Sequence, residues 1–264
     1  MTTKIIDFSR YSSIKIGSPV PITLIDECSE IPKNSYIIGS CSNILIGNNP
    51  PALFMLSKKY DFIHLNNNIL TIGGATPSGK IVSFCKKHDI GGFEFLSHLP
   101  GKLGGLVKMN AGLKEYEIFN NLLDISTCKG KYLKKEIDYG YRYTHIDSPI
   151  LSTSFKVTQG FDHNLVEKFH KMRSNQPKQP SAGSCFKNPP NDYAGRLIDA
   201  VGLKGKRVGN MGWSEIHANF LVNYGDGTYN DAITLIKEAR KKVFEKFQIL
   251  LELEIIILDQ NLEL

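Results

Sequence analysis

The stretch Gln179-Pro180-Ser181-Ala182-Gly183-Ser184-Cys185-Phe186-Lys187-Asn188-Pro189 places a hydroxyl directly after a glycine and follows it with a cation, an amide and a proline. On this local sequence alone, a turn hydroxyl is favoured for Ser184 over a nucleophile or a general acid, because no G-x-S-x-G elbow surrounds it. Two other segments add charged groups. Arg142 lies in Tyr139-Gly140-Tyr141-Arg142-Tyr143, and Glu252 and Glu254 lie in an apolar run near the C-terminus. Together the segments supply a proton donor, an anion clamp and a carboxylate.

Each charged segment has a plainer interpretation. An arginine beside tyrosines usually stacks or pairs on a surface, and a bidentate clamp on a carboxylate or phosphate is the alternative for Arg142. If residues 250–258 form a strand, Glu252 and Glu254 point to one face and the intervening apolar residues to a core. Two solvated carboxylates are then favoured over an acid in a cleft, since glutamate is rarely buried.

Length and composition indicate a protein of two or three lobes. The chain has 264 residues, of which 41% are apolar and 22% charged, as is ordinary for a soluble protein. The N-terminal residues lack the pattern of a secretory signal, and no apolar run is long enough to span a membrane. A cytoplasmic protein without membrane contact is expected.

The cysteines and histidines indicate neither a disulfide framework nor a metal site. The five cysteines are scattered and form no C-x-x-C pair, so they are expected to be reduced thiols. The seven histidines include no H-E-x-x-H spacing, and no metal is expected. The net charge of +6 suits an anionic partner, but without a long Lys/Arg block it favours phosphorylated small molecules over nucleic acid.

Patterns of apolar residues and turn signals predict a mixture of strands and helices, that is, an α+β class. Strands are predicted at 14–16, 22–24, 36–38, 122–127 and 150–157, with a hairpin of 62–65 and 69–72 around three asparagines. Helices are predicted after Thr76-Pro77, at 163–176, at 193–201 with Asn191-Asp192 as cap and Gly202 as terminator, and after an Asn230-Asp231 cap. The predicted lobes are 1–57, 58–172 and 173–251, with 252–264 returning to the second.

Two glycine-rich segments could approach a phosphate closely. The first is Gly39-Ser40-Cys41-Ser42-Asn43, and the second runs from Leu99-Pro100-Gly101-Lys102 through Gly104-Gly105 to Asn110 and Gly112. Neither is a dinucleotide fingerprint or a P-loop, and close packing at the glycines is the alternative. A pair of such loops suits a long ligand that carries a diphosphate.

A local group of cations could contact the same diphosphate. Lys187, Lys204, Lys206 and Arg207 carry these charges, and an ordinary solvated face is the alternative.

In this order, the segments resemble the UDP-N-acetylenolpyruvoylglucosamine reductase family over nearly the whole chain. They are residues 11–17, 37–45, 99–112, 139–144, 181–189, 202–205 and 214–220. The resemblance implies the three-lobed FAD-binding fold of the vanillyl-alcohol-oxidase type, in which two N-terminal lobes hold FAD noncovalently and a C-terminal lobe binds the substrate.

The resemblance also implies a reaction. NADPH would reduce the flavin, and flavin N5 would deliver hydride to C3 of the enolpyruvyl group of UDP-N-acetylglucosamine enolpyruvate. Ser184 would protonate C2, while Arg142 and Glu254 would stabilise the enolate-like species at its carboxylate. The product would be UDP-N-acetylmuramate, a peptidoglycan precursor, made by a cytoplasmic and monomeric enzyme with no nucleic-acid partner.

The resemblance places the binding residues as follows. For FAD they are Gly39, Ser40, Cys41, Ser42, Asn43 and Ile44 in the first loop, with Pro100, Gly101, Gly104, Gly105, Asn110 and Gly112 in the second. For the substrate they are Tyr141, Lys187, Asn188, Lys204 and His217.

The chain departs from the family pattern in both flavin loops. Ser40 and Cys41 stand where glycines are usual, and Lys102 stands where a small hydroxyl residue is common. The span from Arg142 to Ser184 resembles the shorter form, which lacks an inserted tyrosine-bearing loop. A flavin oxidase of the same superfamily and a non-enzymatic nucleotide- or nucleic-acid-binding protein are the alternatives. The first predicts rapid reaction of reduced flavin with oxygen, the second a protein without flavin.

Overall fold

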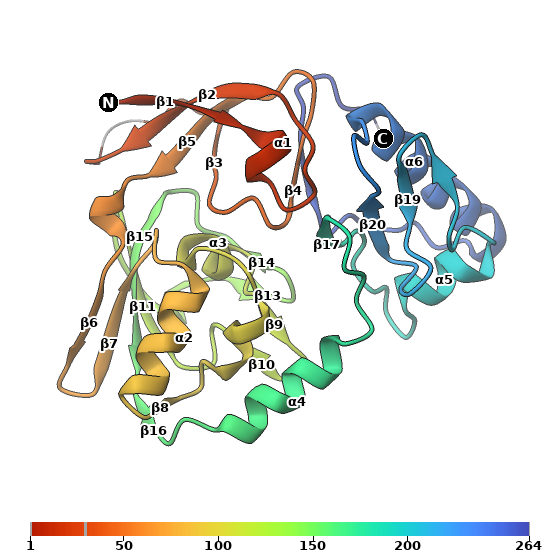
Figure 1. The fold of residues 1–264 in the computed structure, drawn as a ribbon. Helices are drawn as coiled ribbons and strands as arrows, with labels where there is room; N and C mark the ends of the chain where they lie inside the picture. Colours follow the sequence, from red (N-terminus) through yellow and green to blue (C-terminus); the bar gives the residue numbers. More distant parts are fainter. Residues whose placement is uncertain (1, 29–30, 264) are drawn as a thin grey trace. The chain divides into compact units, whose positions relative to one another are not determined.

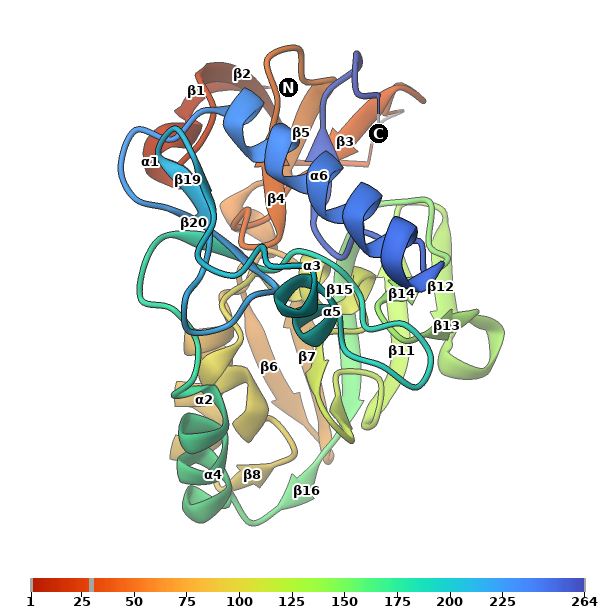
Figure 2. The ribbon, with the colours of Figure 1, turned by 90° about the vertical axis from the view of Figure 1, so that its right-hand side faces the viewer.

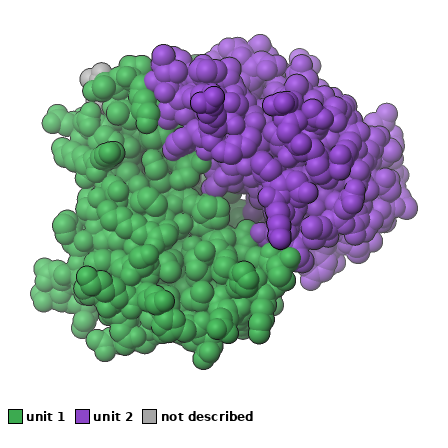
Figure 3. All heavy atoms as spheres, in the orientation of Figure 1, with its two compact units in different colours: residues 1–4, 22–40, 53–174 green, residues 5–21, 41–52, 175–264 purple. Residues whose placement is uncertain are grey.

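The computed structural model describes residues 2–28 and 31–263 and combines helices with several sheets, so the predicted α+β class is confirmed (Figure 1). The chain forms two compact units (Figure 3). Unit 1 comprises Met1–Lys4, Ile22–Ser40 and Leu53–Ser174, and unit 2 comprises Ile5–Pro21, Cys41–Ala52 and Asn175–Leu264. The chain passes from one unit to the other within the first glycine-rich segment, between Ser40 and Cys41. The division into three lobes remains a prediction.

Unit 1 contains an antiparallel sheet in the order β12-β11-β15-β7-β6 (Figure 1). The predicted hairpin is confirmed, because Leu65 lies opposite Leu70, and Asn67 and Asn68 adopt the left-handed conformation that asparagine tolerates. The strands predicted at 122–127 and 150–157 are also confirmed. The five strands are β6 (Ile63–Asn66), β7 (Ile69–Gly73), β11 (Leu122–Thr127), β12 (Gly130–Leu133) and β15 (Ile150–Lys156).

Three helices belong to unit 1: α2 (Ser78–Lys87), α3 (Leu103–Lys108) and α4 (His163–Arg173). Helix α3 packs against β15 and β7, which places the second glycine-rich segment on this sheet (Figure 1). The helix predicted after Thr76 is confirmed, but its predicted cap is wrong. The Thr76 hydroxyl donates to the carbonyl of Phe62, and Pro77 occupies the cap position without a side-chain bond.

A second sheet has the order β1-β2-β5-β3, with β2 parallel to β5. The predicted strands at 22–24 and 36–38 correspond to β2 and β3, but the strand predicted at 14–16 is wrong. Ile14 and Ile16 are buried, yet Lys15 between them has φ 60°, which a strand does not allow. The elements of this region are β1 (Thr3–Asp7), α1 (Phe8–Tyr11), β2 (Pro19–Ile25), β3 (Ser35–Ile37) and β5 (Ala52–Leu56).

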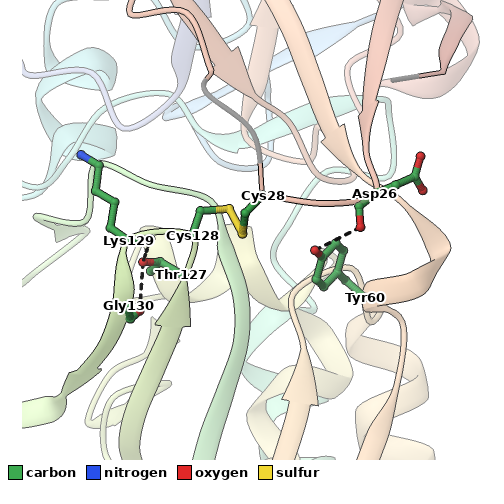
Figure 4. Close-up of a disulfide and its surroundings, with 7 residues drawn as sticks. All are labelled: Asp26, Cys28, Tyr60, Thr127, Cys128, Lys129 and Gly130. Carbon is green, nitrogen blue, oxygen red and sulfur yellow. Dashed lines mark hydrogen bonds between the residues drawn. A yellow bond between two sulfur atoms is a disulfide. The ribbon is translucent and has the colours of Figure 1, made fainter.

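A disulfide links Cys28, in the segment after β2, to Cys128, in the turn between β11 and β12 (Figure 4). Their Cα atoms are 5.2 Å apart, within the range that a disulfide requires. The expectation of five reduced thiols is therefore wrong for this pair. Cys41, Cys85 and Cys185 are buried outside the disulfide. A separation of 100 residues leaves no spacing pattern that could have predicted the pairing.

Unit 2 contains the sheet β17-β20-β19-β18, covered by α6 against β18 and β19, with α5 packed on α6 (Figure 2). Its core includes Trp213, Phe186 and Val243, all fully buried. A short parallel pair joins β4 to β21. The elements are β4 (Ile44–Ile46), β17 (Ser181–Ser184), α5 (Ala194–Ala200), β18 (Arg207–Val208), β19 (Met211–Trp213), β20 (Phe220–Asn223), α6 (Tyr229–Phe247) and β21 (Ile256–Leu258).

Three predicted boundaries in unit 2 differ from the structure. Helix α6 is capped by Thr228, with Asp231 completing a capping box, rather than by Asn230-Asp231. Asp192 does not cap α5 through its side chain, although Gly202, with φ 72°, follows the helix end as predicted. Only Ile256–Leu258 of the predicted strand at 250–258 forms β21, and Leu253 makes one isolated bridge to Phe186.

Short elements complete the fold. They are the 3-10 helices η1 (Lys58–Tyr60), η2 (Glu94–His98) and η3 (Lys134–Glu136), and the strands β8 (Ile90–Gly91), β9 (Gly112–Leu113), β10 (Tyr116–Glu117), β13 (Tyr139–Gly140), β14 (Tyr143–Thr144) and β16 (Thr158–Gln159). Among residues 2–28 and 31–263, no helix has the length and apolar character needed to cross a membrane.

Candidate active site

Ser184 ends strand β17, where it lies opposite Phe220 of β20. Gly183, directly before it, has φ 80°, a conformation that costs glycine little and other residues more. Directly after it, the N–H of Cys185 donates to the carbonyl of Asn219 at 2.7 Å. The half-buried Ser184 is therefore held between a glycine turn and a short backbone hydrogen bond.

Glu254 lies beside the residue that follows Ser184. Its N–H donates to the carbonyl of Cys185 at 2.9 Å, and the N–H of Ile255 reaches the same oxygen at 3.3 Å. Burial raises the pKa of the Cys185 thiol well above its usual range, and the negative charge of Glu254 raises it further. The structure therefore brings two of the three predicted catalytic residues together within unit 2.

Glu252 and Glu254 have different surroundings. Glu252 is exposed and forms an ion pair with Lys187, its Oε2 lying 3.4 Å from Nζ. The N–H of Lys187 also donates to the carbonyl of Glu252 at 2.9 Å. Glu254 is half-buried beside Cys185. The solvated interpretation therefore fits Glu252, whereas the backbone of Glu254 is bonded to Cys185, the residue that follows Ser184.

The unit 2 part of the first glycine-rich segment contacts the chain at Glu254. The side-chain N–H of Asn43 donates to the carbonyl of Glu254 at 2.9 Å, and the N–H of Ile256 donates to the carbonyl of Asn43 at 2.9 Å. Cys41 is 2% exposed with φ 51°. The predicted flavin-binding residue Asn43 thus contacts the backbone of Glu254, a predicted catalytic residue.

Within unit 1, the two glycine-rich segments touch each other. A Cβ added at Gly39 would lie 3.5 Å from the Cβ of Lys102. At Gly104 it would lie 3.2 Å from the carbonyl oxygen of Gly74, so this glycine allows close packing. Gly105 is exposed, and its added Cβ would meet no atom within 4 Å. Close packing therefore explains Gly104, while open space surrounds the position of a side chain at Gly105.

Gly101, in the same segment, also has a structural role. Its carbonyl accepts a hydrogen bond from Ser78 N–H at 2.9 Å, and an added Cβ would lie 2.9 Å from Leu106. It follows Pro100, and both residues precede helix α3.

Arg142 is held by the end of the second glycine-rich segment. It lies between β13 and β14 with φ 66°, and its Nη2 donates to the carbonyl of Gly112 at 3.2 Å. Its guanidinium lies 4.7 Å from the ring centroid of Tyr141. Buried Asn110 donates to the carbonyl of Gly140 at 3.1 Å and to Glu117 at 2.8 Å. Asn110 therefore fixes the hairpin that carries Arg142.

The cations of the predicted local group, Lys187, Lys204, Lys206 and Arg207, each have an acidic or aromatic neighbour. Lys204 pairs with Asp199 at 3.5 Å, and Lys206 pairs with Glu238 at 2.5 Å. The guanidinium of Arg207 lies 3.5 Å from the centroid of the Tyr224 ring. With Lys187 paired to Glu252, these residues do not form an array of uncompensated charge.

Asn188 and His217 make specific local contacts. Asn188 accepts a hydrogen bond from Ala194 N–H at 3.1 Å, at the first residue of α5. His217 Nδ1 accepts from Asn219 N–H at 3.3 Å. Burial lowers the pKa of His217, and the nearby positive charge of Lys204 lowers it further. A neutral His217 with Nδ1 occupied as an acceptor carries its proton on Nε2.

Two residues that the sequence analysis left without a role contact these groups. Asn219, 2% exposed, contacts Cys185, Phe186 and His217. Arg173 donates to the carbonyl of His98, and burial followed by the charge of Arg142 lowers its pKa. Asn219 lies in the segment 214–220, which resembles the family. The sequence could therefore have indicated this residue, but not its contacts. No metal-binding group of three acidic, histidine or cysteine side chains occurs in the described part of the chain.

Comparisons with known proteins agree with one another. The family model for the C-terminal domain of UDP-N-acetylenolpyruvoylglucosamine reductase matches residues 176–258. The reductase of that name from Helicobacter hepaticus is 47% identical over 98% of this chain and 100% of its own. That of Campylobacter jejuni strain RM1221 is 44% identical over 96% of this chain and 100% of its own. The crystal structure of the Thermus caldophilus reductase superposes with a TM-score of 0.86, at 28% identity, over 98% of this chain and 99% of its own.

Proposed function

The chain belongs to the UDP-N-acetylenolpyruvoylglucosamine reductase family of oxidoreductases, and from that membership we propose that it converts UDP-N-acetylglucosamine enolpyruvate to UDP-N-acetylmuramate with FAD and NADPH. We place this reaction in peptidoglycan precursor synthesis in the cytoplasm, carried out by a monomer without a nucleic-acid partner.

The residues of the two glycine-rich segments fit a noncovalently bound FAD. Gly105 leaves open space where a side chain would stand, so a large group can approach its backbone. Half-buried Lys102, whose stem lies against Gly39, brings a positive charge that suits a diphosphate. We assign FAD to these segments together with Cys41 and Asn43. A bound FAD would accept hydride from NADPH and supply it to the enolpyruvyl group.

Ser184, Arg142 and Glu254 act on the substrate in this proposal. Arg142 binds the enolpyruvyl carboxylate, where negative charge increases during the reaction, because a preorganised guanidinium stabilises developing charge without reorganising. Ser184 donates the proton to C2, and Glu254 helps to stabilise the enolate-like species that is protonated. Tyr141, Lys187, Asn188, Lys204 and His217 bind the rest of the sugar nucleotide.

The observation that best supports these roles is the hydrogen bond from Glu254 N–H to the carbonyl of Cys185, at 2.9 Å. This bond joins the segment of the proposed proton donor to the segment of the proposed carboxylate. A nucleotide-binding protein without chemistry would not require these two side chains on neighbouring segments.

Analysis of the product tests the function. The purified protein is supplied with FAD, NADPH and UDP-N-acetylglucosamine enolpyruvate in D2O. We expect a product in which the enolpyruvyl double bond is reduced and C2 carries deuterium. Consumption of NADPH with hydrogen peroxide formation and unchanged sugar nucleotide would instead identify a flavin oxidase.

A further inference from the structure

Asn219 contacts the chain directly after Ser184 with both its backbone and its side chain. Its carbonyl accepts from Cys185 N–H at 2.7 Å. Its side-chain oxygen accepts from Phe186 N–H at 3.0 Å, and its side-chain N–H donates to the carbonyl of Phe186 at 2.8 Å. The amide therefore pairs with Phe186 as a backbone peptide group of a neighbouring strand would.

Cys185 and Phe186 also contact the segment that carries Glu254. The carbonyl of Cys185 accepts from Glu254 N–H, and Phe186 forms a bridge with Leu253. Cys185 and Phe186 are thus held between Asn219 and the segment of Glu254. Any displacement of Cys185 would move both the backbone of Ser184 and the hydrogen-bond acceptor of Glu254.

Asn219 also contacts His217, one of the predicted substrate-binding residues. Its N–H donates to His217 Nδ1 at 3.3 Å. The backbone and side chain of Asn219 therefore form hydrogen bonds with Cys185, Phe186 and His217. At 2% exposure it is shielded from water, and it has no access to a substrate of its own.

We propose that Asn219 is a positioning residue for the proton-transfer step, because it fixes Ser184 and Glu254 relative to each other through Cys185 and Phe186. That this step is a proton transfer rests on the proposed function. That Asn219 links Ser184 to Glu254 rests on the hydrogen bonds described above. Ser184 and Glu254 remain the residues that touch the substrate.

Asn223, at the end of β20, provides a matched control for Asn219, which directly precedes this strand. It is 3% exposed, and its side chain donates to the carbonyl of Ile14 at 3.0 Å and accepts from Gly225 N–H at 2.9 Å. Removing either amide leaves buried partners unsatisfied. The side-chain hydrogen bonds of Asn223 go to Ile14, Lys15, Gly225 and Gly227 and reach neither Cys185 nor Glu254, so only the effect on structure should be common to the two variants.

The first experiment measures the two halves of the reaction separately by stopped flow. Asn219→Ala should slow flavin reoxidation by the enolpyruvyl sugar on the order of 100-fold, since small misplacements of catalytic groups have such effects. Flavin reduction by NADPH should change by less than about threefold. Asn223→Ala should leave both rates near those of wild type. If Asn219→Ala does not fold, Asn219→Asp, which keeps the shape but removes the donor to Phe186, is compared with Asn223→Asp.

A double-mutant cycle then tests whether Asn219 acts through Ser184. The Ser184→Ala/Asn219→Ala variant should be no slower in reoxidation than Ser184→Ala alone. Multiplied effects in the double variant, or equal behaviour of the Asn219 and Asn223 variants, would overturn the inference.

Amide hydrogen exchange of the protein without substrate tests the coupling independently of the reaction. Asn219→Ala should accelerate exchange at the Glu254 amide, and Asn223→Ala should not. An unchanged Glu254 amide would overturn the inference even if the function is correct. If the sugar nucleotide fails to reoxidise the flavin of the wild-type protein, the proposed function and the positioning role of Asn219 in it are both wrong, while the exchange result still decides the coupling.

Discussion

The N–H of Glu254 lies 2.9 Å from the carbonyl oxygen of Cys185 and donates a hydrogen bond to it. Because Cys185 follows Ser184, this bond joins two segments that are far apart in the sequence. The neighbouring acidic residue, Glu252, instead forms an exposed ion pair with Lys187. Two glutamates on one short segment therefore have different surroundings, and their substitution should have different consequences.

Glu254→Gln should slow flavin reoxidation by the enolpyruvyl sugar about 100-fold or more, because it removes the carboxylate that is proposed to assist proton transfer from Ser184. Glu252→Gln is the matched control. An exposed ion pair contributes about 0–1 kcal/mol, so its loss should change the rate less than about fivefold. Stopped-flow absorbance measures both variants. If Glu252→Gln proved the slower of the two, the assignment of Glu254 would be wrong.

Ser184→Ala should leave flavin reduction by NADPH largely intact and slow reoxidation by about 100- to 10,000-fold, the usual contribution of a positioned acid. Ser181→Ala, at the other end of β17, serves as the control. The rate of each half-reaction is measured under anaerobic conditions. Equal slowing of both halves by Ser184→Ala would contradict a role confined to proton transfer.

Reduction of the Cys28–Cys128 disulfide should destabilise the protein. The bond closes a loop with a sequence separation of 100, for which chain entropy gives up to about 4.7 kcal/mol, and measured values are typically about 2–4 kcal/mol. Urea unfolding with and without dithiothreitol measures the difference, and Cys128→Ser is the control that should not respond to the reductant. Identical wild-type curves under both conditions would mean that the disulfide does not form in solution.

Stability should decrease as the pH falls below the ordinary pKa of histidine, about 6.5. Burial lowers the pKa of His217, with a contribution from Lys204, so the folded protein binds fewer protons than the unfolded chain. His98 acts in the same direction, because burial and the nearby positive charges of His170 and Arg173 lower its pKa. The stabilisation is complete above about pH 6.5 and is lost as the pH falls toward the folded-state values.

His217→Gln should therefore weaken this pH dependence without removing it, because His98 remains. Urea unfolding at about pH 7.5 and about pH 5.5 gives the change in the free energy of unfolding for each protein. If the variant and wild type lose the same stability over this interval, His217 is not neutral in the folded protein at the lower pH.

The sequence predicted elements whose determinants are local. Three consecutive asparagines permit the left-handed turn between β6 and β7, and Gly202 supplies the conformation that follows α5. The strand at 14–16 failed for the opposite reason. Ile14 and Ile16 are buried as an alternating pattern predicts, but the backbone at Lys15 turns, because Asn223 binds the carbonyls of Ile14 and Lys15 from a distant part of the sequence.

The site shows the same limit. In the sequence, Glu252 and Glu254 are equivalent residues on one face of an expected strand, and what separates them is Lys187 and Cys185, which come from another segment. The family resemblance selected the segments to which the proposed site is assigned. The contacts of Asn219 depend on how β20 aligns with β17, and this register is not encoded in any local pattern.

The most direct test of the account is the visible absorbance of the FAD-reconstituted protein under anaerobic conditions, first with NADPH and then with UDP-N-acetylglucosamine enolpyruvate. The account predicts that the flavin band bleaches with NADPH and returns with the sugar nucleotide. A flavin that remains bleached until oxygen is admitted, or a protein that binds no FAD, would contradict it.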